Sequence, residues 1–368
     1  MIRLLMLFGA YLVVSAVIFG LAWLISRIAG RIHEKKAALA ESDEATQQLN
    51  TNFKQLARRT KTKRWALTAW IAGAVVVLLA GAALTINAQW MEKAFLKSSK
   101  QAQTFLTIQS PNVRNNNLVI SAYGAFSSNL HADTFKNIDG YRVDWQDFDW
   151  HIGTLGSSND GYHYQSVSPV FQNNGYYTQG TNQKIASFFL SKADYQSKAF
   201  YGLKPTHEAQ TLSKLPNHLS EVALTFDKPY TYAEIQKMIP LNLMLNWYWL
   251  GVSDPSNIKA SVGTYYGLAS DTDENGNPTG KLATDSYDKI FVPQVKSQDD
   301  RSSTDDFYPG EDAKEMVKKY PTLEKAKFSG VILTGRTENL AVLDKQSWAF
   351  ATNVGVSTEI LPYQTPVK

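Results

Sequence analysis

The 368-residue chain contains no cysteine. This excludes disulfide bonds, thiolate metal ligands and a cysteine nucleophile. The six histidines include no pair at H-x-H or H-x-x-x-H spacing, so the zinc hydrolase pattern is also missing. A glycine-rich phosphate loop is lacking too, because the stretch Thr334-Gly335-Arg336-Thr337 has one glycine. We therefore expect a protein that is not an enzyme, with no catalytic, cofactor-binding or metal-binding residues.

Two partial motifs remain in a polar stretch, residues 270–308, which reads as a long insertion. Asp271-Thr272-Asp273-Glu274-Asn275-Gly276 resembles the front half of a calcium loop. Its twelfth position is Leu282, where an EF-hand requires a glutamate. This favours a solvated acidic turn, and leaves open a calcium site closed by a distant carboxylate. Ser286-Tyr287-Asp288-Lys289 matches S-x-x-K without the accompanying K-T-G, which indicates a chance match.

Two long apolar runs stand near the N-terminus. Trp65–Ala88 contains no charged residue and would span roughly 36 Å as a helix, enough to cross a ~30 Å hydrocarbon core. Leu4–Ser26 is a second uncharged run of 23 residues. A cleaved signal peptide is the competing interpretation, but its apolar region is usually only ~7–15 residues long. We predict transmembrane helices within residues 1–28 and 65–88.

Charge is distributed unevenly along the chain. Residues 1–88 hold 11 Lys and Arg against 4 Asp and Glu, whereas residues 89–368 hold 26 against 29. Ten of the basic residues fall within 27–64, between the two runs. Basic loops stay in the cytoplasm, which predicts a cell-membrane protein with both termini outside. The slightly acidic remainder argues against direct nucleic-acid binding.

The predicted cytoplasmic segment, residues 29–64, carries a narrow apolar stripe at helical spacing. The stripe consists of Ala45, Leu49, Phe53, Leu56 and Ala57. One interpretation is a helix lying on anionic membrane lipids. The other is a docking helix for a cytoplasmic partner, and its candidate partner-binding residues are Leu49, Phe53, Leu56, Arg58 and Arg59.

We predict that the extracytoplasmic part has two regions, a stalk with a β-rich region over 89–205 and a C-terminal domain over 206–368. The first includes a turn at Asp139-Gly140. In the second, Glu221–Phe226 alternates like a half-buried strand turned by Asp227-Lys228-Pro229, and Thr231 and Glu234 have the spacing of a capping box. The predicted fold class is α+β, with helices on a mostly antiparallel sheet, plus the two transmembrane helices.

An aromatic strand, Trp247-Tyr248-Trp249, belongs to this domain. Trp247 and Trp249 share one face of the strand and Tyr248 the other. This pair of tryptophans could form an outer recognition surface for a glycan. Alternatively, both faces are covered and the rings belong to the core.

Three blocks of residues together resemble the membrane-bound anti-sigma factors, or sigma factor regulators, of Gram-positive bacteria. The blocks are Phe53–Arg59 running into Trp65–Ala88 with Phe135–Tyr141, then Val222–Thr231 with Trp247–Trp249, and then Gly330–Leu340. The resemblance implies a cytoplasmic element that binds an extracytoplasmic-function sigma factor, and an outer domain that senses cell-envelope stress. It implies no catalytic residues.

The run Leu4–Ser26 departs from that family pattern. It makes the expected sigma-binding element a loop of only 38 residues, 27–64, tethered at both ends. A second membrane subunit could complete the binding surface. The alternative function is a cell-wall-binding or adhesion protein with no transcriptional role, suggested by the Asn-, Tyr- and Trp-rich exterior.

Overall fold

The computed structural model describes residues 46–124, 126–153, 156–159, 170–178, 182–190, 204–253, 265–283, 285–296 and 309–368, together with Gly20. Apart from Gly20, the predicted span Leu4–Ser26 lies outside these residues, so the first transmembrane helix stays a prediction. The chain divides into two compact units, Met1–Trp90 and Met91–Lys368.

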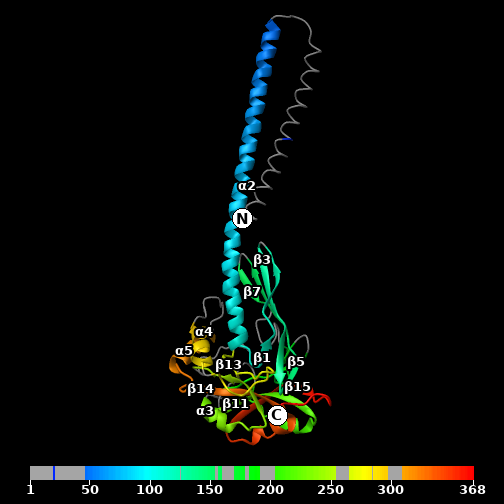
Figure 1. The fold of residues 1–368 in the computed structure, drawn as a ribbon, viewed down its shortest axis with the longest axis vertical. Helices are drawn as coiled ribbons and strands as arrows, with labels where there is room; N and C mark the ends of the chain where they lie inside the picture. Colours follow the sequence, from blue (N-terminus) through cyan, green and yellow to red (C-terminus); the bar gives the residue numbers. More distant parts are fainter. Residues whose placement is uncertain are drawn as a thin grey trace. The chain divides into compact units, whose positions relative to one another are not determined.

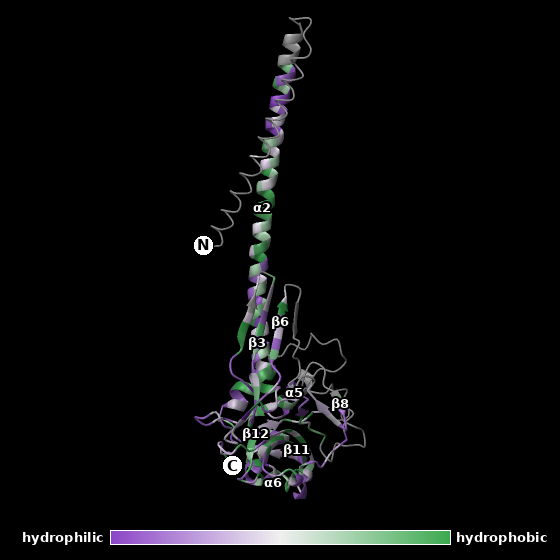
Figure 2. Ribbon diagram, turned by 90° about the vertical axis from the view of Figure 1, so that its right-hand side faces the viewer, coloured by the Kyte–Doolittle hydropathy of each residue, from purple (hydrophilic) through white to green (hydrophobic). Residues whose placement is uncertain are grey.

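Helix α2 (Thr46–Ile108) is the only described helix long and apolar enough to cross a membrane (Figure 1). Its uncharged stretch, green in Figure 2, exposes large apolar side chains, including Val76 at 64% and Leu78 at 70%. Burying apolar surface is worth ~25 cal/mol per Å², so a stretch exposed in this way favours a lipid environment. α2 is compatible with a membrane anchor.

Residues 89–108, at the start of the predicted stalk and β-rich region, form the last part of α2 and are partly buried. Within the second unit, Met91, Ala102 and Phe105 of α2 are buried in a cluster with residues of β3 and β6. The Phe105 and Phe148 rings stack with their centroids 5.8 Å apart. The last turns of α2 therefore belong to the packed structure.

The described strands form four sheets, and every ladder between them is antiparallel. The first, in the order β1-β4-β5, consists of β1 (Val113–Asn115), β4 (Thr134–Ile138) and β5 (Tyr141–Asp144). The second, β2-β3-β6-β7, consists of β2 (Val119–Tyr123), β3 (Ser127–Ala132), β6 (Phe148–Gly153) and β7 (Gly156–Asn159). The third, β10-β9-β8, consists of β8 (Val170–Gln172), β9 (Gly175–Tyr177) and β10 (Lys184–Ile185). The fourth, β13-β12-β14-β11-β15, consists of β11 (His218–Thr231), β12 (Met244–Trp249), β13 (Gly267–Ala269), β14 (Lys327–Arg336) and β15 (Ala349–Glu359).

Short helices lie between these strands. They are η1 (Ala209–Lys214), α3 (Tyr232–Met238), η3 (Ser286–Phe291), α4 (Val292–Lys296), α5 (Pro309–Lys319), α6 (Thr337–Leu340) and η5 (Leu343–Lys345). The mixture of helices with antiparallel sheets agrees with the predicted α+β class. The predicted capping box is confirmed: the Thr231 hydroxyl accepts from the backbone N–H of Glu234, whose carboxylate accepts from Thr231 N–H.

The five-stranded sheet has two covered faces. On one face, Val222, Leu224 and Tyr248 share a core with buried residues of the helices, among them Ile235 of α3 and Val317 of α5. The other face carries Ala223, Trp247, Trp249 and Ile332, which share a core with Phe188 and with residues of the β1-β4-β5 sheet and β10. The β1-β4-β5 sheet, which we call the small sheet, thus covers one face of the five-stranded sheet, which we call the large sheet. The helices cover the opposite face.

Two local predictions need correction. The strand predicted over Glu221–Phe226 is buried on both faces and continues through Asp227-Lys228-Pro229, with a register shift in place of a turn. Residues 270–308 are not simply a polar insertion, since Tyr287 and Phe291 are 0% exposed and stack with ring centroids 5.5 Å apart. Both errors arise because local polarity does not show which apolar residues a distant sheet will cover.

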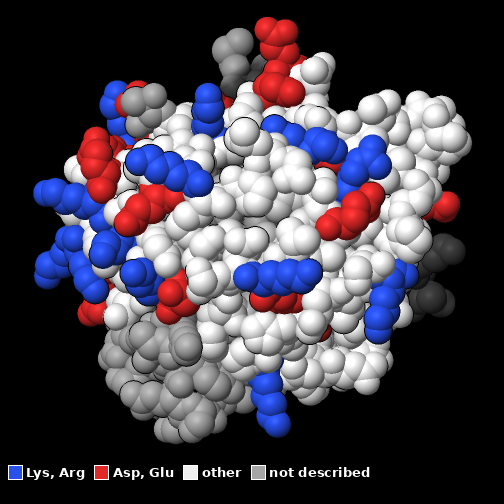
Figure 3. Space-filling view, turned by 90° about the horizontal axis from the view of Figure 1, so that it is seen from below, with Lys and Arg blue, Asp and Glu red and all other residues white. Residues whose placement is uncertain are grey.

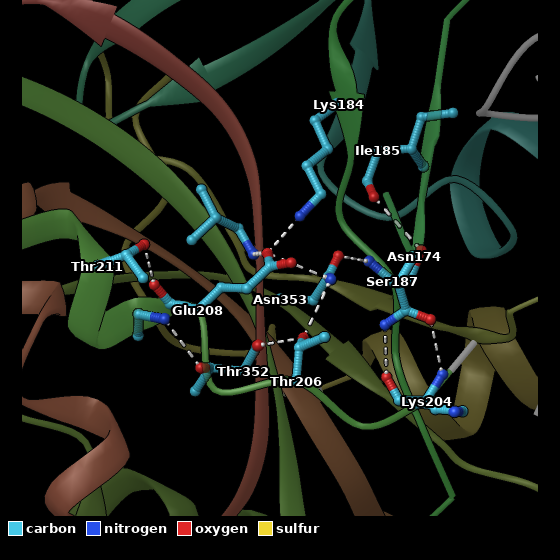
Figure 4. Close-up of polar contacts among 12 residues, drawn as sticks. Asn174, Lys184, Ile185, Ser187, Lys204, Thr206, Glu208, Thr211, Thr352 and Asn353 are labelled. Atoms are coloured by element: carbon cyan, nitrogen blue, oxygen red, sulfur yellow. Dashed lines mark hydrogen bonds and ion pairs between the residues drawn. The ribbon is translucent and has the colours of Figure 1, made fainter. Parts of the chain in front are cut away.

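The edge strand β15 is held by polar side chains from the segment before η1 (Figure 4). The Glu208 carboxylate accepts from Lys184 Nζ, from Asn353 Nδ2 (3.3 Å) and from the Val354 backbone N–H (2.9 Å). His207 pairs with Thr352 through an isolated parallel bridge. These contacts cover part of an edge that would otherwise present free backbone groups.

Candidate functional site

The predicted partner-binding residues lie on α2, in the first unit. Phe53 and Leu56 are exposed at 67% and 65%, and the side chain of Leu49 lies outside the described residues. Arg58 and Arg59 are exposed as well. A hollow on one side of the helix is lined by Phe53, Leu56, Ala57, Thr60, Lys61, Arg64 and Trp65. We call this set the α2 face.

The α2 face extends beyond the residues that the sequence singled out. Its members recur at three- and four-residue intervals, which places them on one side of a helix turning about 100° per residue. By the same spacing Arg59 points well away from it, whereas Lys61 and Arg64 supply its positive charge. The helical spacing could have been extended to Trp65, which was assigned only to the membrane. Lys61 and Arg64 would then have been recognised on the same side of the helix. Exposed aromatic rings beside cationic side chains suit a protein partner that is apolar and acidic.

A second site is fully buried and lies at the end of α2 within the second unit. We call it the junction and define it by seven polar residues that are each at most 3% exposed. They are Asn112, Lys136, Asn137, Asp139, Glu221, Asn246 and Thr334. Buried polar groups are stable only when they are hydrogen-bonded, so their partners show what the junction holds together.

At the centre of the junction, Lys136 Nζ of β4 lies 2.7 Å from Glu221 Oε2 of β11. The same ammonium group is 4.1 Å from the centroid of the Trp145 ring. Glu221 Oε1 accepts a hydrogen bond of 2.9 Å from Asn112 Nδ2. Both carboxylate oxygens are therefore paired, and the small sheet is tied to the large one.

Asn246 of β12 extends this network across the large sheet. Its Nδ2 donates to Asn112 Oδ1 and to the Asn137 carbonyl, both at 2.7 Å. Its Oδ1 accepts from Thr334 Oγ1 of β14 at 3.0 Å. Thr334 Oγ1 in turn accepts from the Asp139 backbone N–H at 3.1 Å. Three adjacent strands, β12, β14 and β11, thus contribute side chains to one cluster.

Asp139 occupies the predicted Asp-Gly turn between β4 and β5. Asp139 and Gly140 have φ values of 52° and 91°, which confirms the turn and explains the glycine. The carboxyl Oδ1 accepts from the Lys368 backbone N–H at 3.0 Å, whereas Oδ2 is buried without a partner among the described residues. Burial raises the pKa of Asp139 to about 7, against the lowering effect of the Lys368 hydrogen bond and the Arg336 charge.

The junction begins four residues after α2 ends. Ile108, the last residue of α2, is 2% exposed and belongs to the core on the helical face of the large sheet. Gln109 Nε2 donates to the Tyr266 hydroxyl at 3.0 Å, and Asn112 reaches Glu221. The end of α2 is therefore fixed by both apolar and polar contacts.

The other residues that the sequence nominated have structural roles. Trp247 and Trp249 are 0% and 1% exposed, and the Phe188 ring stacks on Trp249 with centroids 4.8 Å apart. Their burial favours the core interpretation over outer recognition. In the acidic turn, Asp273 Oδ1 accepts from the backbone N–H groups of Asn275 and Asn277, and Leu282 is buried. The carboxylate of Asp273 therefore shapes its own turn.

One group of metal-ligating residue types was not foreseen from the sequence. Ligand atoms of His131, Asp133 and Asp147 lie within 4.8 Å of one another, and both carboxylates are exposed. His131 Nδ1 lies 2.8 Å from Asp149, and Nε2 lies 3.1 Å from Asp133. The hydrogen bond to Asp149 raises the pKa of His131, which favours an ion pair between the strands β3 and β6.

A helix long and apolar enough to cross a membrane, in a chain that also forms an α+β unit, is compatible with a membrane-anchored protein. The model of the sigma factor regulator N-terminal domain matches residues 54–143, and that of the sigma factor regulator C-terminal domain matches residues 212–356. The chain belongs to the sigma factor regulator family. Its role is regulatory and its partner class is a sigma factor. No curated protein and no solved structure matches the chain.

The two matched regions meet at the junction. Asn112, Lys136, Asn137 and Asp139 belong to the N-terminal match, and Glu221, Asn246 and Thr334 belong to the C-terminal match. Because these residues are bonded to one another within one compact unit, the boundary between the family models is not a boundary in the fold. Our finer division of the exterior into 89–205 and 206–368 stays a prediction.

Proposed function

We propose that the protein restrains an extracytoplasmic-function sigma factor at the cell membrane and senses the state of the envelope through residues 91–368. The observation that carries the proposal is the α2 face. Phe53, Leu56 and Trp65 are all more than 60% exposed there, beside the cations Lys61 and Arg64. Such a surface is suited to bury an amphipathic helix of the sigma factor.

The proposed topology follows from charge. The basic residues before Trp65 stay in the cytoplasm, the uncharged stretch of α2 crosses the membrane, and residues 91–368 lie outside. The face of the folded unit seen in Figure 3 carries Lys and Arg interspersed with Asp and Glu. A face on which both signs of charge are mixed is not a basic patch of the kind that binds nucleic acids. Leu4–Ser26 supplies the other span and places the N-terminus outside.

The cytoplasmic segment remains short for a sigma-binding element. Membrane lipids of the inner leaflet attract its Lys and Arg side chains, each worth about 1 kcal/mol near the surface. A second membrane subunit would enlarge the docking surface. The family assignment favours this regulatory role over the alternative of a wall-binding or adhesion protein without a role in transcription.

The docking proposal is tested by co-purifying sigma factors with the full-length protein extracted from membranes. Phe53→Asp and Leu56→Asp place a charge in the α2 face and should abolish capture. Gln55→Asp is the matched control, because residue 55 is exposed on the opposite side of the same turn. Capture that survives both substitutions in the α2 face would rule out docking there.

The proposed topology is tested separately. Because the chain has no cysteine, single cysteines can be introduced at the exposed positions Lys61 and Ser121 without interference. A membrane-impermeant maleimide applied to intact cells should label residue 121 and leave residue 61 unlabelled. The reverse pattern would invert the whole arrangement.

A further inference from the structure

The junction connects the five-stranded sheet to Asn112, which lies four residues after the end of α2. We propose that the buried Lys136–Glu221 pair, with Asn112, is the element through which the C-terminal sheet controls the end of α2. This inference rests on the proposed function for its biological meaning. The coupling itself is a physical property of residues 91–368.

Glu221 connects three parts of the chain, because its side chain has two partners and its backbone belongs to a third part. Its carboxylate binds Lys136 of the β1-β4-β5 sheet and Asn112, which follows α2, while its backbone pairs with β14 and β15 inside the five-stranded sheet. Lys136, Glu221 and Asn112 are between 0% and 3% exposed, so water cannot replace a lost partner. A change in the position of β11 must therefore move Asn112 or leave a buried charge without its hydrogen bond.

The energetics of buried ion pairs favour a role for the Lys136–Glu221 pair in positioning the end of α2, rather than in stabilising the fold. Removing the charges of a buried ion pair from water costs several kcal/mol per ion, and a well-packed apolar pair often stabilises as much or more. Apolar contacts are non-directional, so they would permit the end of α2 to settle in several positions on the sheet. Hydrogen bonds with fixed geometry, 2.7 Å to Lys136 and 2.9 Å to Asn112, select one position.

The hydrogen-bond network also connects several strands of the large sheet. Asn246 of β12 and Thr334 of β14 connect to Asn112 and to the Asp139 turn. Displacement of β12 would change the bond between Asn246 and Asn112 directly, and displacement of β14 would reach Asn112 through the bond between Thr334 and Asn246. The coupling is tested by a measurement at α2 in response to a change at the Lys136–Glu221 pair.

The decisive experiment measures amide hydrogen exchange of the last turns of α2, residues 101–108, in the full chain held in lipid nanodiscs. Asn112→Gly removes the amide that binds Glu221 and keeps the positive φ of 55° available. We expect exchange in 101–108 to accelerate about tenfold or more, because the variant loses the buried hydrogen bonds of Asn112 to Glu221 and to Asn246. Asn217→Gly is the matched control, because Asn217 also has a positive φ of 57° but lies outside the junction.

A second variant tests the pair itself. Lys136→Met with Glu221→Leu replaces the ions by apolar groups and leaves no unpaired charge. The folded unit should keep its exchange protection in β11 and β14, whereas residues 101–108 should lose theirs. Unchanged exchange in 101–108 for both Asn112→Gly and the double variant would overturn the coupling role. Sigma factor capture is measured independently. If no sigma factor is captured but exchange in 101–108 accelerates in the variants, the proposed function is refuted and the coupling role stands.

Discussion

Gly355 lies directly against the carboxylate of Glu221. A Cβ atom at residue 355 would stand 2.4 Å from Glu221 Oε2 and 2.8 Å from Ala186 Cβ. Strand β15 can therefore approach the buried Lys136–Glu221 pair only because residue 355 has no side chain. Space beside the ion pair is as much a part of the junction as its hydrogen bonds.

The substitution Gly355→Ala should consequently destabilise the folded unit. The added methyl group must displace a buried carboxylate or shift β15, and overpacking of this kind typically costs about 1–3 kcal/mol. Urea unfolding of the full-length protein in detergent, followed by tryptophan fluorescence, measures the loss. Gly276→Asn is the control, because nothing lies within 4 Å of a Cβ there and asparagine tolerates the φ of 80°. Equal stability of the two variants would contradict this account of the junction.

The Asp139 carboxyl should make stability depend on pH. Its pKa is raised to about 7 in the folded protein from an ordinary value of 3.8, so the folded state holds a proton that the unfolded state has already lost. Unfolding then releases that proton, and the free energy of unfolding should fall as pH rises from about 4 through about 7.

Asp139→Asn isolates this contribution, since an amide does not titrate in that range. The variant should show a smaller decrease in the free energy of unfolding between about pH 5 and about pH 8 than the unmodified protein. Urea unfolding at the two pH values provides the comparison. Parallel pH profiles would mean that the carboxyl does not titrate in this window.

The capping box of α3 should make a measurable local contribution. Thr231→Ala removes the hydroxyl that accepts from the Glu234 N–H, which typically costs about 1 kcal/mol. Glu234→Gln should cost less, because glutamine can still reach back to the N-cap backbone. Thermal unfolding ranks the stability of the unmodified protein and the two variants. A greater loss for Glu234→Gln than for Thr231→Ala would assign the effect to charge rather than to hydrogen bonding.

The tryptophans of β12 should behave as core residues. Trp249→Ala removes a ring that is 1% exposed and stacks on Phe188, so we expect a loss of about 3–5 kcal/mol in the free energy of unfolding. Leu241→Ala, at a position 89% exposed, is the control and should be nearly neutral. If Trp249→Ala left stability unchanged, the recognition interpretation of this strand would regain support.

Local patterns in the sequence were sufficient for several features. The uncharged run at Trp65–Ala88 determined a long apolar helix, and the spacing of Thr231 and Glu234 determined a helix start. Asp139-Gly140 determined a turn, because few other residue pairs adopt two positive φ values. The alternation at 247–249 separated Tyr248 from its two neighbours, as the two cores confirm. Each of these rests on interactions between residues close in the chain.

The junction could not be found in that way. Lys136 and Glu221 are 85 residues apart, and each alone has the character of a surface residue. Tyr287 and Phe291 likewise lay hidden within a stretch that was polar on average. The sequence by itself determined the long apolar helix, the uneven distribution of charge and the local elements. Only the tertiary structure decided which polar side chains became buried partners, because that depends on which faces distant strands present to each other.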